Sequence, residues 1–177
     1  MKLNNSAINS YLYTGEYSKF LSSLPPTENI AYIIFYRGFG NYYLKEYTKA
    51  AADFDRAYQL DPSLYSQVGA ALSSGIRGDR EQGLSLLRDL ERKIDERNVR
   101  DAEGVYKVAQ GYAVLGDKVS ALRVLRRSIE GGFICYPYFV SDPLIEPLRS
   151  EPDYATLIEL ARQRHEEFKR QFFSGSS

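Results

Sequence analysis

The chain has very few of the residues on which catalytic and metal sites most often depend. Its 177 residues include one cysteine, one histidine and no tryptophan. A single cysteine, Cys135, cannot form an internal disulfide. No apolar run approaches the roughly 18 residues of a membrane span, and the first residues lack the apolar core of a signal peptide. We therefore expect a cytoplasmic protein without a membrane partner.

The chain also lacks an excess of charge of either sign. Lys and Arg together number 23, and so do Asp and Glu. Binding to nucleic acid depends on a basic face that displaces counterions, so we expect no nucleic-acid partner for this domain. We favour a surface of balanced charge, with a local basic strip as the alternative. The residues that would form the strip are Arg123, Arg126, Arg127, Arg162, Arg164 and Lys169, and the acidic residues that would balance them are Glu130, Glu159 and Glu166.

What the chain does contain is one short phrase repeated four times. Each copy has an apolar stretch, a tight turn, and a second apolar stretch with a small residue near its start. The turns begin at Thr14, Leu44, Arg77 and Leu115, about 30, 33 and 38 residues apart. A period in this range predicts stacked helix pairs, because one pair cannot bury its apolar face alone.

We therefore predict an all-α fold, an α-solenoid of about four helix pairs with a C-terminal cap. The pairs are expected at residues 1–30, 31–63, 64–101 and 102–132, and the cap at 133–177. The second pair is the clearest, with helices at about 29–44 and 47–60. Ala50, Phe54 and Ala57 share one stripe of its second helix, where small residues let helix axes approach.

The repeat fails after Gly131-Gly132, and the remaining sequence predicts a lid. Residues 133–140 should lie as an ordered apolar segment over the last pair. Asp142 is a suitable cap for a short helix that starts at Pro143. The final helix should begin near Glu151; its expected buried side consists of Tyr154, Leu157, Ile158, Ala161 and Phe168.

The repeated blocks resemble tetratricopeptide repeats, whose pattern alternates small and aromatic positions and closes with proline. The residues that carry the resemblance are Gly38, Ala50, Phe54, Ala57 and Pro62, and then Ala109, Tyr112, Gly116, Ala121 and Leu125. The resemblance covers about residues 1–132 and implies a module that binds a protein or peptide. Arg37 and Asn41 depart from it, because they fall where the family has apolar residues.

The tail carries a narrower resemblance. Gly-Gly-Phe133, Asp142-Pro143-Leu144 and Asp153-Tyr154 look like the end of bacterial tetratricopeptide proteins. In many of these, the repeats follow a winged-helix or Ser/Thr-kinase domain. The resemblance implies that this chain is the C-terminal part of a larger bacterial regulatory protein.

Candidates for catalysis are weak, and we expect no catalytic, metal or cofactor site. His165 has Ala161, Arg162 and Lys169 as its helical neighbours, and cations repel a metal ion. Cys135 lies among apolar residues, which favours a small buried side chain over a nucleophile. The glycine-rich run at residues 111–118 lacks the Ser or Thr and the preceding strand of a phosphate loop. A hydrolase that uses Cys135 or His165 is kept as an alternative.

The chain is rich in aromatic residues, with 15 Tyr and 9 Phe. Tyrosine gives contact area at low entropic cost, and interfaces are enriched in it. We predict a non-catalytic protein–protein interaction through a groove lined by aromatic side chains: Tyr13, Tyr32, Phe35, Phe39, Tyr42, Tyr43, Tyr65 and Tyr106. Core packing is the competing explanation for about half of them. A homodimer formed through residues 133–140 is a further alternative.

Overall fold

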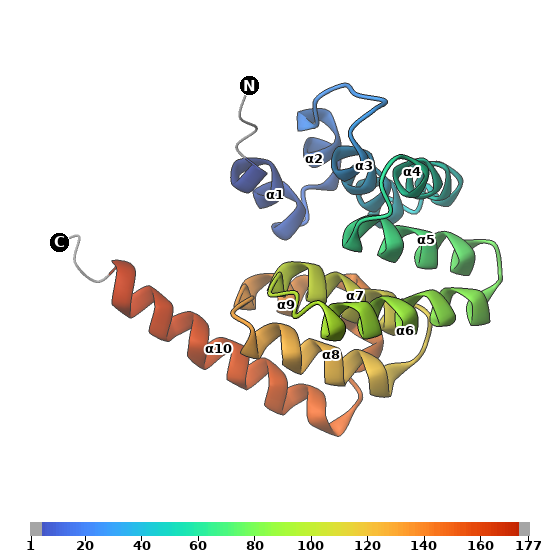
Figure 1. Ribbon diagram of the computed structural model, residues 1–177. Coiled ribbons are helices and arrows are strands. Elements are labelled where there is room, and N and C mark those ends of the chain that lie inside the picture. The colour runs from blue at the N-terminus through green and yellow to red at the C-terminus, as the bar shows by residue number, and fades with distance from the viewer. Residues whose placement is uncertain (1–4, 174–177) are drawn as a thin grey trace. The chain divides into compact units, whose positions relative to one another are not determined.

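The computed structural model describes residues 5–173, and side chains from residue 9 onward. Every regular element in this range is a helix, so the all-α prediction is confirmed (Figure 1). Within the described range, no helix combines the length and the apolar character needed to cross a bilayer. The chain divides into two compact units, Met1–Val99 and Arg100–Ser177.

The described part of the first unit consists of consecutive helices, each packed against the next. They are α1 (Asn5–Tyr13), α2 (Tyr17–Ser23), α3 (Ala31–Tyr43), α4 (Tyr47–Leu60), α5 (Leu64–Ile76) and α6 (Arg80–Glu96). Helices α3 and α5, the first members of two successive pairs, also touch each other. The predicted helices of the second pair are confirmed to within two residues at each end.

The repeated phrase in the sequence corresponds to a repeated turn. Gly15, Lys45, Gly78 and Gly116 all adopt positive φ angles, between 63° and 85°. In each turn, the amide of the following residue donates to a carbonyl five residues earlier, as from Glu46 to Asn41 at 2.9 Å. This is how a left-handed residue satisfies the last carbonyls of a helix. Lys45 shows that glycine is preferred at this position but not obligatory.

Phe54 is the central side chain of the first unit. It is fully buried, and its ring lies 5.8–5.9 Å from the ring centroids of Phe35 and Phe39. A Cβ at Gly38 or Gly69 would come within 2.7 or 2.8 Å of the Phe54 ring. The two glycines therefore leave the space that the ring of α4 fills between α3 and α5.

Arg37 and Asn41, which depart from the repeat pattern, have a shared partner. Arg37 donates to Oδ1 of Asp53 at 2.6 and 3.0 Å, and Asn41 donates to Oδ2 at 2.9 Å. Asp55, two residues further along α4, instead accepts from Ser73 at 2.8 Å on α5. The two carboxylates thus point to different helices, as their spacing predicts, and form ties between neighbouring helices.

The described part of the second unit contains the fourth predicted pair together with the predicted cap. Its elements are α7 (Ala102–Val114), α8 (Lys118–Glu130), α9 (Tyr136–Ser141), the 3₁₀ helix η1 (Pro143–Leu148) and α10 (Pro152–Phe173). Helix α7 packs on α8 and η1, and α10 packs on α8 and α9. The division of the chain therefore falls before the fourth pair, at 99/100, and not at 132/133. Asp142 caps η1 as predicted, because its Oδ1 accepts from the Leu144 amide at 2.9 Å.

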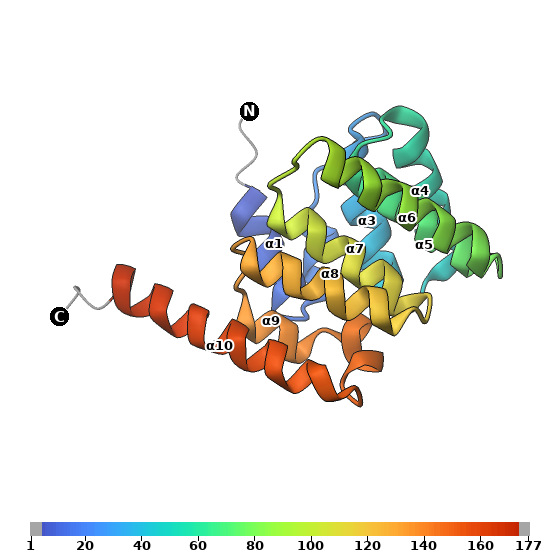
Figure 2. The ribbon, with the colours of Figure 1, turned by 60° about the horizontal axis from the view of Figure 1, so that its bottom comes forward.

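Helix α10 is longer than the surface of its unit that it covers. Its first half buries Tyr154, Leu157 and Ala161. Its second half carries no buried side chain, and both views show it extending past α8 and α9 (Figures 1 and 2). The prediction that Phe168 belongs to the buried side is wrong, since 44% of this residue is exposed. Helix α10 extends beyond the helices on which it packs, α8 and α9, before it reaches Phe168.

Candidate functional site

Half of the predicted aromatic groove is core. Phe35, Phe39 and Tyr106 are fully buried, and Tyr43 is only 9% exposed. Both Phe35 and Phe39 pack against Phe54 of α4, and Phe35 also packs against Tyr65 of α5. None of these four side chains is available to a ligand on the surface, so their assignment to a groove is corrected.

The other four predicted residues, Tyr13, Tyr32, Tyr42 and Tyr65, are half-buried. Tyr32 of α3 and Tyr65 of α5 meet edge to face, with ring centroids 5.3 Å apart. Tyr42 instead packs against Tyr47 at 5.2 Å, and burial raises the pKa of its hydroxyl to about 12. The structure therefore brings Tyr32 and Tyr65 together, and their contact is the part of the predicted groove that remains at a surface.

A buried polar network occupies the middle of the second unit. Asp142 Oδ2 accepts from the Tyr106 hydroxyl at 2.6 Å and from the Gln110 amide at 2.5 Å. Gln110 also donates to the Tyr138 hydroxyl at 3.0 Å. Burial raises the pKa of Tyr106 well above its ordinary value, with the Asp142 charge acting in the same direction. The network joins α7, α9 and the start of η1.

Lys107 is the most unusual member of this region, because lysine is almost never fully buried. Its side chain is wholly inaccessible, and Nζ lies 3.4 Å from the Tyr138 hydroxyl and 5.3 Å from the centroid of that ring. Burial lowers the pKa of Lys107, while the carboxylates of Glu103 and Asp142 oppose the shift. Because these groups are enclosed by protein, the network holds the unit together and is not a site open to substrate.

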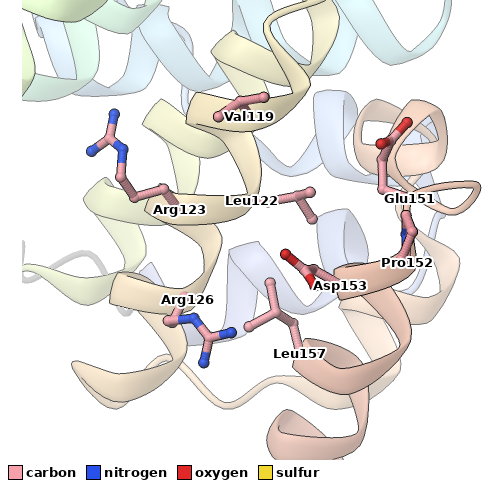
Figure 3. A pocket seen from close by; sticks show the side chains of 8 residues that line it. All are labelled: Val119, Leu122, Arg123, Arg126, Glu151, Pro152, Asp153 and Leu157. Atoms are coloured by element: carbon pink, nitrogen blue, oxygen red, sulfur yellow. The ribbon is translucent and has the colours of Figure 1, made fainter.

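An open hollow lies between α8 and the first half of α10. The first part has a volume of about 430 Å³ and is lined by Val119, Leu122, Arg123, Arg126, Glu151, Pro152, Asp153 and Leu157 (Figure 3). A second part of about 560 Å³ is lined by Arg126, Ala155, Thr156, Glu159, Leu160 and Gln163. Arg126 lines both parts, so we treat them as one feature and call it the α8–α10 groove.

The groove has a direction, because its two helices run parallel. Near its start, Lys118 Nζ of α8 lies 2.7 Å from Glu151 Oε1; near its end, Arg164 of α10 donates to the Ile129 carbonyl at 2.8 Å. Glu151 and Asp153 therefore lie at the start of the groove. Arg123 and Arg126 lie on the opposite wall, that of α8, and Arg126 lies further along the groove (Figure 3).

The apolar lining of the groove is accessible. Val119 is 80% exposed, more than Phe173 at the end of α10, which is 67% exposed. Leu122 is half-buried and lies beside the buried Leu157. An exposed apolar strip with charged walls can bind the apolar face of another polypeptide and orient it by its charges. In the sequence, Val119 reads as an ordinary first-turn residue. Its exposure follows only from the way α10 packs alongside α8.

The arginines around the groove support the balanced surface that we favour over a basic strip. Arg126 lies 4.0 Å from Glu130, and Arg162 lies 2.7 Å from Glu159. Lys169 pairs with Glu166 at 3.4 Å. Such exposed pairs contribute little stability, but they reduce the net positive charge that a nucleic acid would meet.

Neither residue of the hydrolase alternative is activated. His165 Nδ1 lies 3.0 Å from the carbonyl oxygen of Ile134, which ties α10 to the segment before α9. Burial raises the pKa of the Cys135 thiol, so it stays protonated and is a poor nucleophile. Within residues 5–173, no three His, Cys, Asp or Glu side chains are arranged to hold a metal ion.

No protein-family model matches the sequence, and no curated protein is detectably similar to it.

Proposed function

We propose that the chain is a non-catalytic protein-interaction module and that the α8–α10 groove binds a short amphipathic segment of a partner. The observation that carries the proposal is the accessible apolar strip of Val119 and Leu122 between walls of opposite charge. Apolar surface in a hollow that is rimmed by charged residues is a feature of protein-interaction sites. The carboxylates of Glu151 and Asp153 at one end, and Arg126 further along, where Glu159 is already paired with Arg162, give the segment a preferred direction.

The expected energetics are those of a small interface. A partner side chain that fills the apolar part of the groove gains roughly 1.5–3 kcal/mol from its own burial. Val119 and Leu122 add the burial of their exposed surface. One or two anchoring side chains should therefore dominate the affinity, and the charged walls should mainly set orientation and association rate.

The helix pairs and their recurring turn support a tetratricopeptide-like organisation, which is part of this proposal. In such a module, stacked pairs act as a rigid support for a binding surface. Here the proposed surface lies on the second helix of the fourth pair and on the capping helix, instead of on the aromatic first helices. The sequence resemblance implies that the module is the C-terminal part of a bacterial regulatory protein.

A selection from a displayed peptide library, followed by calorimetric titration of the selected peptides, tests the proposal. We expect amphipathic peptides whose binding is lost in Leu122→Glu and weakened in Arg126→Glu. Val140→Glu is the matched control, because Val140 is also exposed on this unit but lies outside the groove. Selected peptides that bind both groove variants as tightly as the parent chain would contradict the proposal.

A further inference from the structure

The end of α10 presents an exposed aromatic cluster, which we call the aromatic end. It consists of Phe168, Phe172 and Phe173, which are 44%, 61% and 67% exposed. The Phe168 ring centroid lies 4.7 Å from that of Phe172 and 6.2 Å from that of Phe173. Three exposed phenyl rings on one helix end form an apolar surface of the kind that associates with protein.

The aromatic end continues the seam by which α10 packs on its own unit. The buried Tyr154, Leu157 and Ala161 are followed at steps of three or four residues by His165, Phe168 and Phe172. Residues at these steps share one face of a helix. The packing face of α10 therefore persists beyond the surface that it covers, and its last part requires cover from elsewhere.

The aromatic end cannot fill the α8–α10 groove of its own chain. The groove is lined by residues 151–163 of the same continuous helix. At a rise of about 1.5 Å per residue, Phe168 lies about 16 Å further along the axis than Leu157. A straight helix cannot fold its own end back onto its start, so any contact between the two must join separate molecules.

The charges around Phe168 match those of the groove in one orientation. Glu166 and Glu167 precede Phe168, and Lys169 and Arg170 follow it. If the second helix runs antiparallel to α10, its basic residues approach the acidic start of the groove and its acidic residues approach the guanidinium groups further along. In the parallel orientation, Glu166 and Glu167 would instead approach Glu151 and Asp153; Glu159, in the far part of the groove, is paired with Arg162. Lys118 already engages Glu151, and Lys169 engages Glu166, so the match orients the contact more than it strengthens it.

We propose that the aromatic end of one molecule binds, antiparallel, in the α8–α10 groove of a second copy of this chain. The inference rests on the proposed function, because it names an occupant for the same groove. It commits to self-association through α10, and not through residues 133–140, where Tyr138 and Phe139 are buried.

The contact should be head-to-tail. At 100° per residue, the groove residues Thr156, Leu160 and Gln163 lie about a third of a turn around α10 from Phe168 and Phe172. Two straight α10 helices side by side cannot present both faces to each other at once. Each molecule therefore keeps one free groove or one free aromatic end, and association continues into open chains.

Sedimentation and light scattering of the full chain over a concentration series test this inference. We expect the average mass to rise past that of a dimer as concentration increases. Phe168→Ser with Phe172→Ser should weaken association at least about tenfold, the change that a loss of 1.4 kcal/mol produces. Tyr58→Ser is the matched control, because it also removes an exposed aromatic side chain.

Mixing two variants gives the sharper result. Leu122→Glu blocks the groove and keeps the aromatic end intact. The double Phe variant removes the aromatic end and keeps the groove intact. Arg126→Glu replaces Leu122→Glu if the latter folds poorly. Each variant alone should be monomeric, and an equal mixture should form a dimer and nothing larger. Dimers of the groove variant alone would indicate contact between two aromatic ends and overturn the inference.

A parent chain that stays monomeric at every concentration would also overturn it. That result leaves the proposed function intact if library peptides still bind the parent chain and fail to bind Arg126→Glu. Loss of both peptide binding and self-association would remove both proposals.

Discussion

The two units of this chain are both helical, yet their interiors are built by different chemistry. The first unit is centred on rings: Phe54 packs between Gly38 and Gly69 and against Phe35 and Phe39. The second combines rings packed around Tyr106 with hydrogen bonds that converge on Asp142. In the first, ionic groups such as Arg37 and Asp53 lie at the margin of the core. In the second, a lysine and a carboxylate lie inside it.

This difference indicates what each unit must preserve. A core of rings depends on shape, so a loss of volume is its main vulnerability. A buried polar network depends on every member keeping its partner, because an unsatisfied buried group bears its full desolvation cost. The following predictions test whether that contrast holds, from the largest expected effect to the smallest.

Phe54→Ala should cost the most, about 3–5 kcal/mol of unfolding free energy, because it empties the space between two helix pairs. Hydrogen exchange should show the loss of protection mainly within residues 31–76. Phe54→Leu, which keeps most of the volume, should cost about 1.5 kcal/mol or less. Equal losses in the two variants would show that shape does not govern this core.

Asp142→Ala should cost about 3 kcal/mol and act on the second unit. It removes the acceptor of Tyr106, Gln110 and the Leu144 amide at once, and it leaves Glu103 as the carboxylate that still acts on Lys107. Denaturant titration measures the total, and hydrogen exchange places it in α7 and η1. Asp142→Asn keeps one acceptor and should lose less. An alanine variant as stable as the parent would refute the role of the network.

Alkaline pH should stabilise the second unit through Lys107. Its pKa is lowered in the folded chain, so the unfolded chain binds more protons between that value and the ordinary pKa of about 10.4. The Lys107 contribution to stability should therefore rise with pH in this window, while ionisation of Cys135 and of Tyr106 in the unfolded chain opposes it above about pH 8.5 and about pH 10. Lys107→Met should flatten the rise. If stability rises with pH just as steeply in Lys107→Met, the rise comes from another titratable group.

The Arg37–Asp53 tie in the first unit should show the smallest effect. A double-mutant cycle with Arg37→Met and Asp53→Asn should give a coupling of about 1 kcal/mol, since the arginine is partly exposed. The more exposed Arg92–Glu96 pair is the control and should give less. A coupling of several kcal/mol at Arg37 would show that ionic ties also govern the first unit.

The sequence predicts much of the first unit and little of what distinguishes the second. Apolar spacing and the recurring turn predict the helices, because both are local features of the sequence. Gly15, Gly78 and Gly116, for example, adopt the positive φ angle that ends a helix. The positions of Arg37 and Asn41 look like errors of phase until Asp53 is seen opposite them. Partners on another helix cannot be deduced from spacing along one.

The candidate site was harder to predict for the same reason. Tyrosines and phenylalanines on the first helices suggest a binding face, but Phe39 and Tyr106 are fully buried in the core and cannot contact a ligand. The α8–α10 groove arises where the capping helix runs alongside α8, and no residue in it is unusual in sequence. Phe168 follows the periodicity of a buried stripe, and its exposure depends on where the neighbouring helices end.

The most direct test of the central claim is a nuclear magnetic resonance titration of the isotope-labelled chain with a peptide selected by it. If the α8–α10 groove is the binding surface, amide shifts should change in residues 119–126 and 151–163 and stay constant around Tyr32 and Tyr65. Changes centred on Tyr32 and Tyr65, with the groove unaffected, would contradict the account and return the binding surface to the first unit.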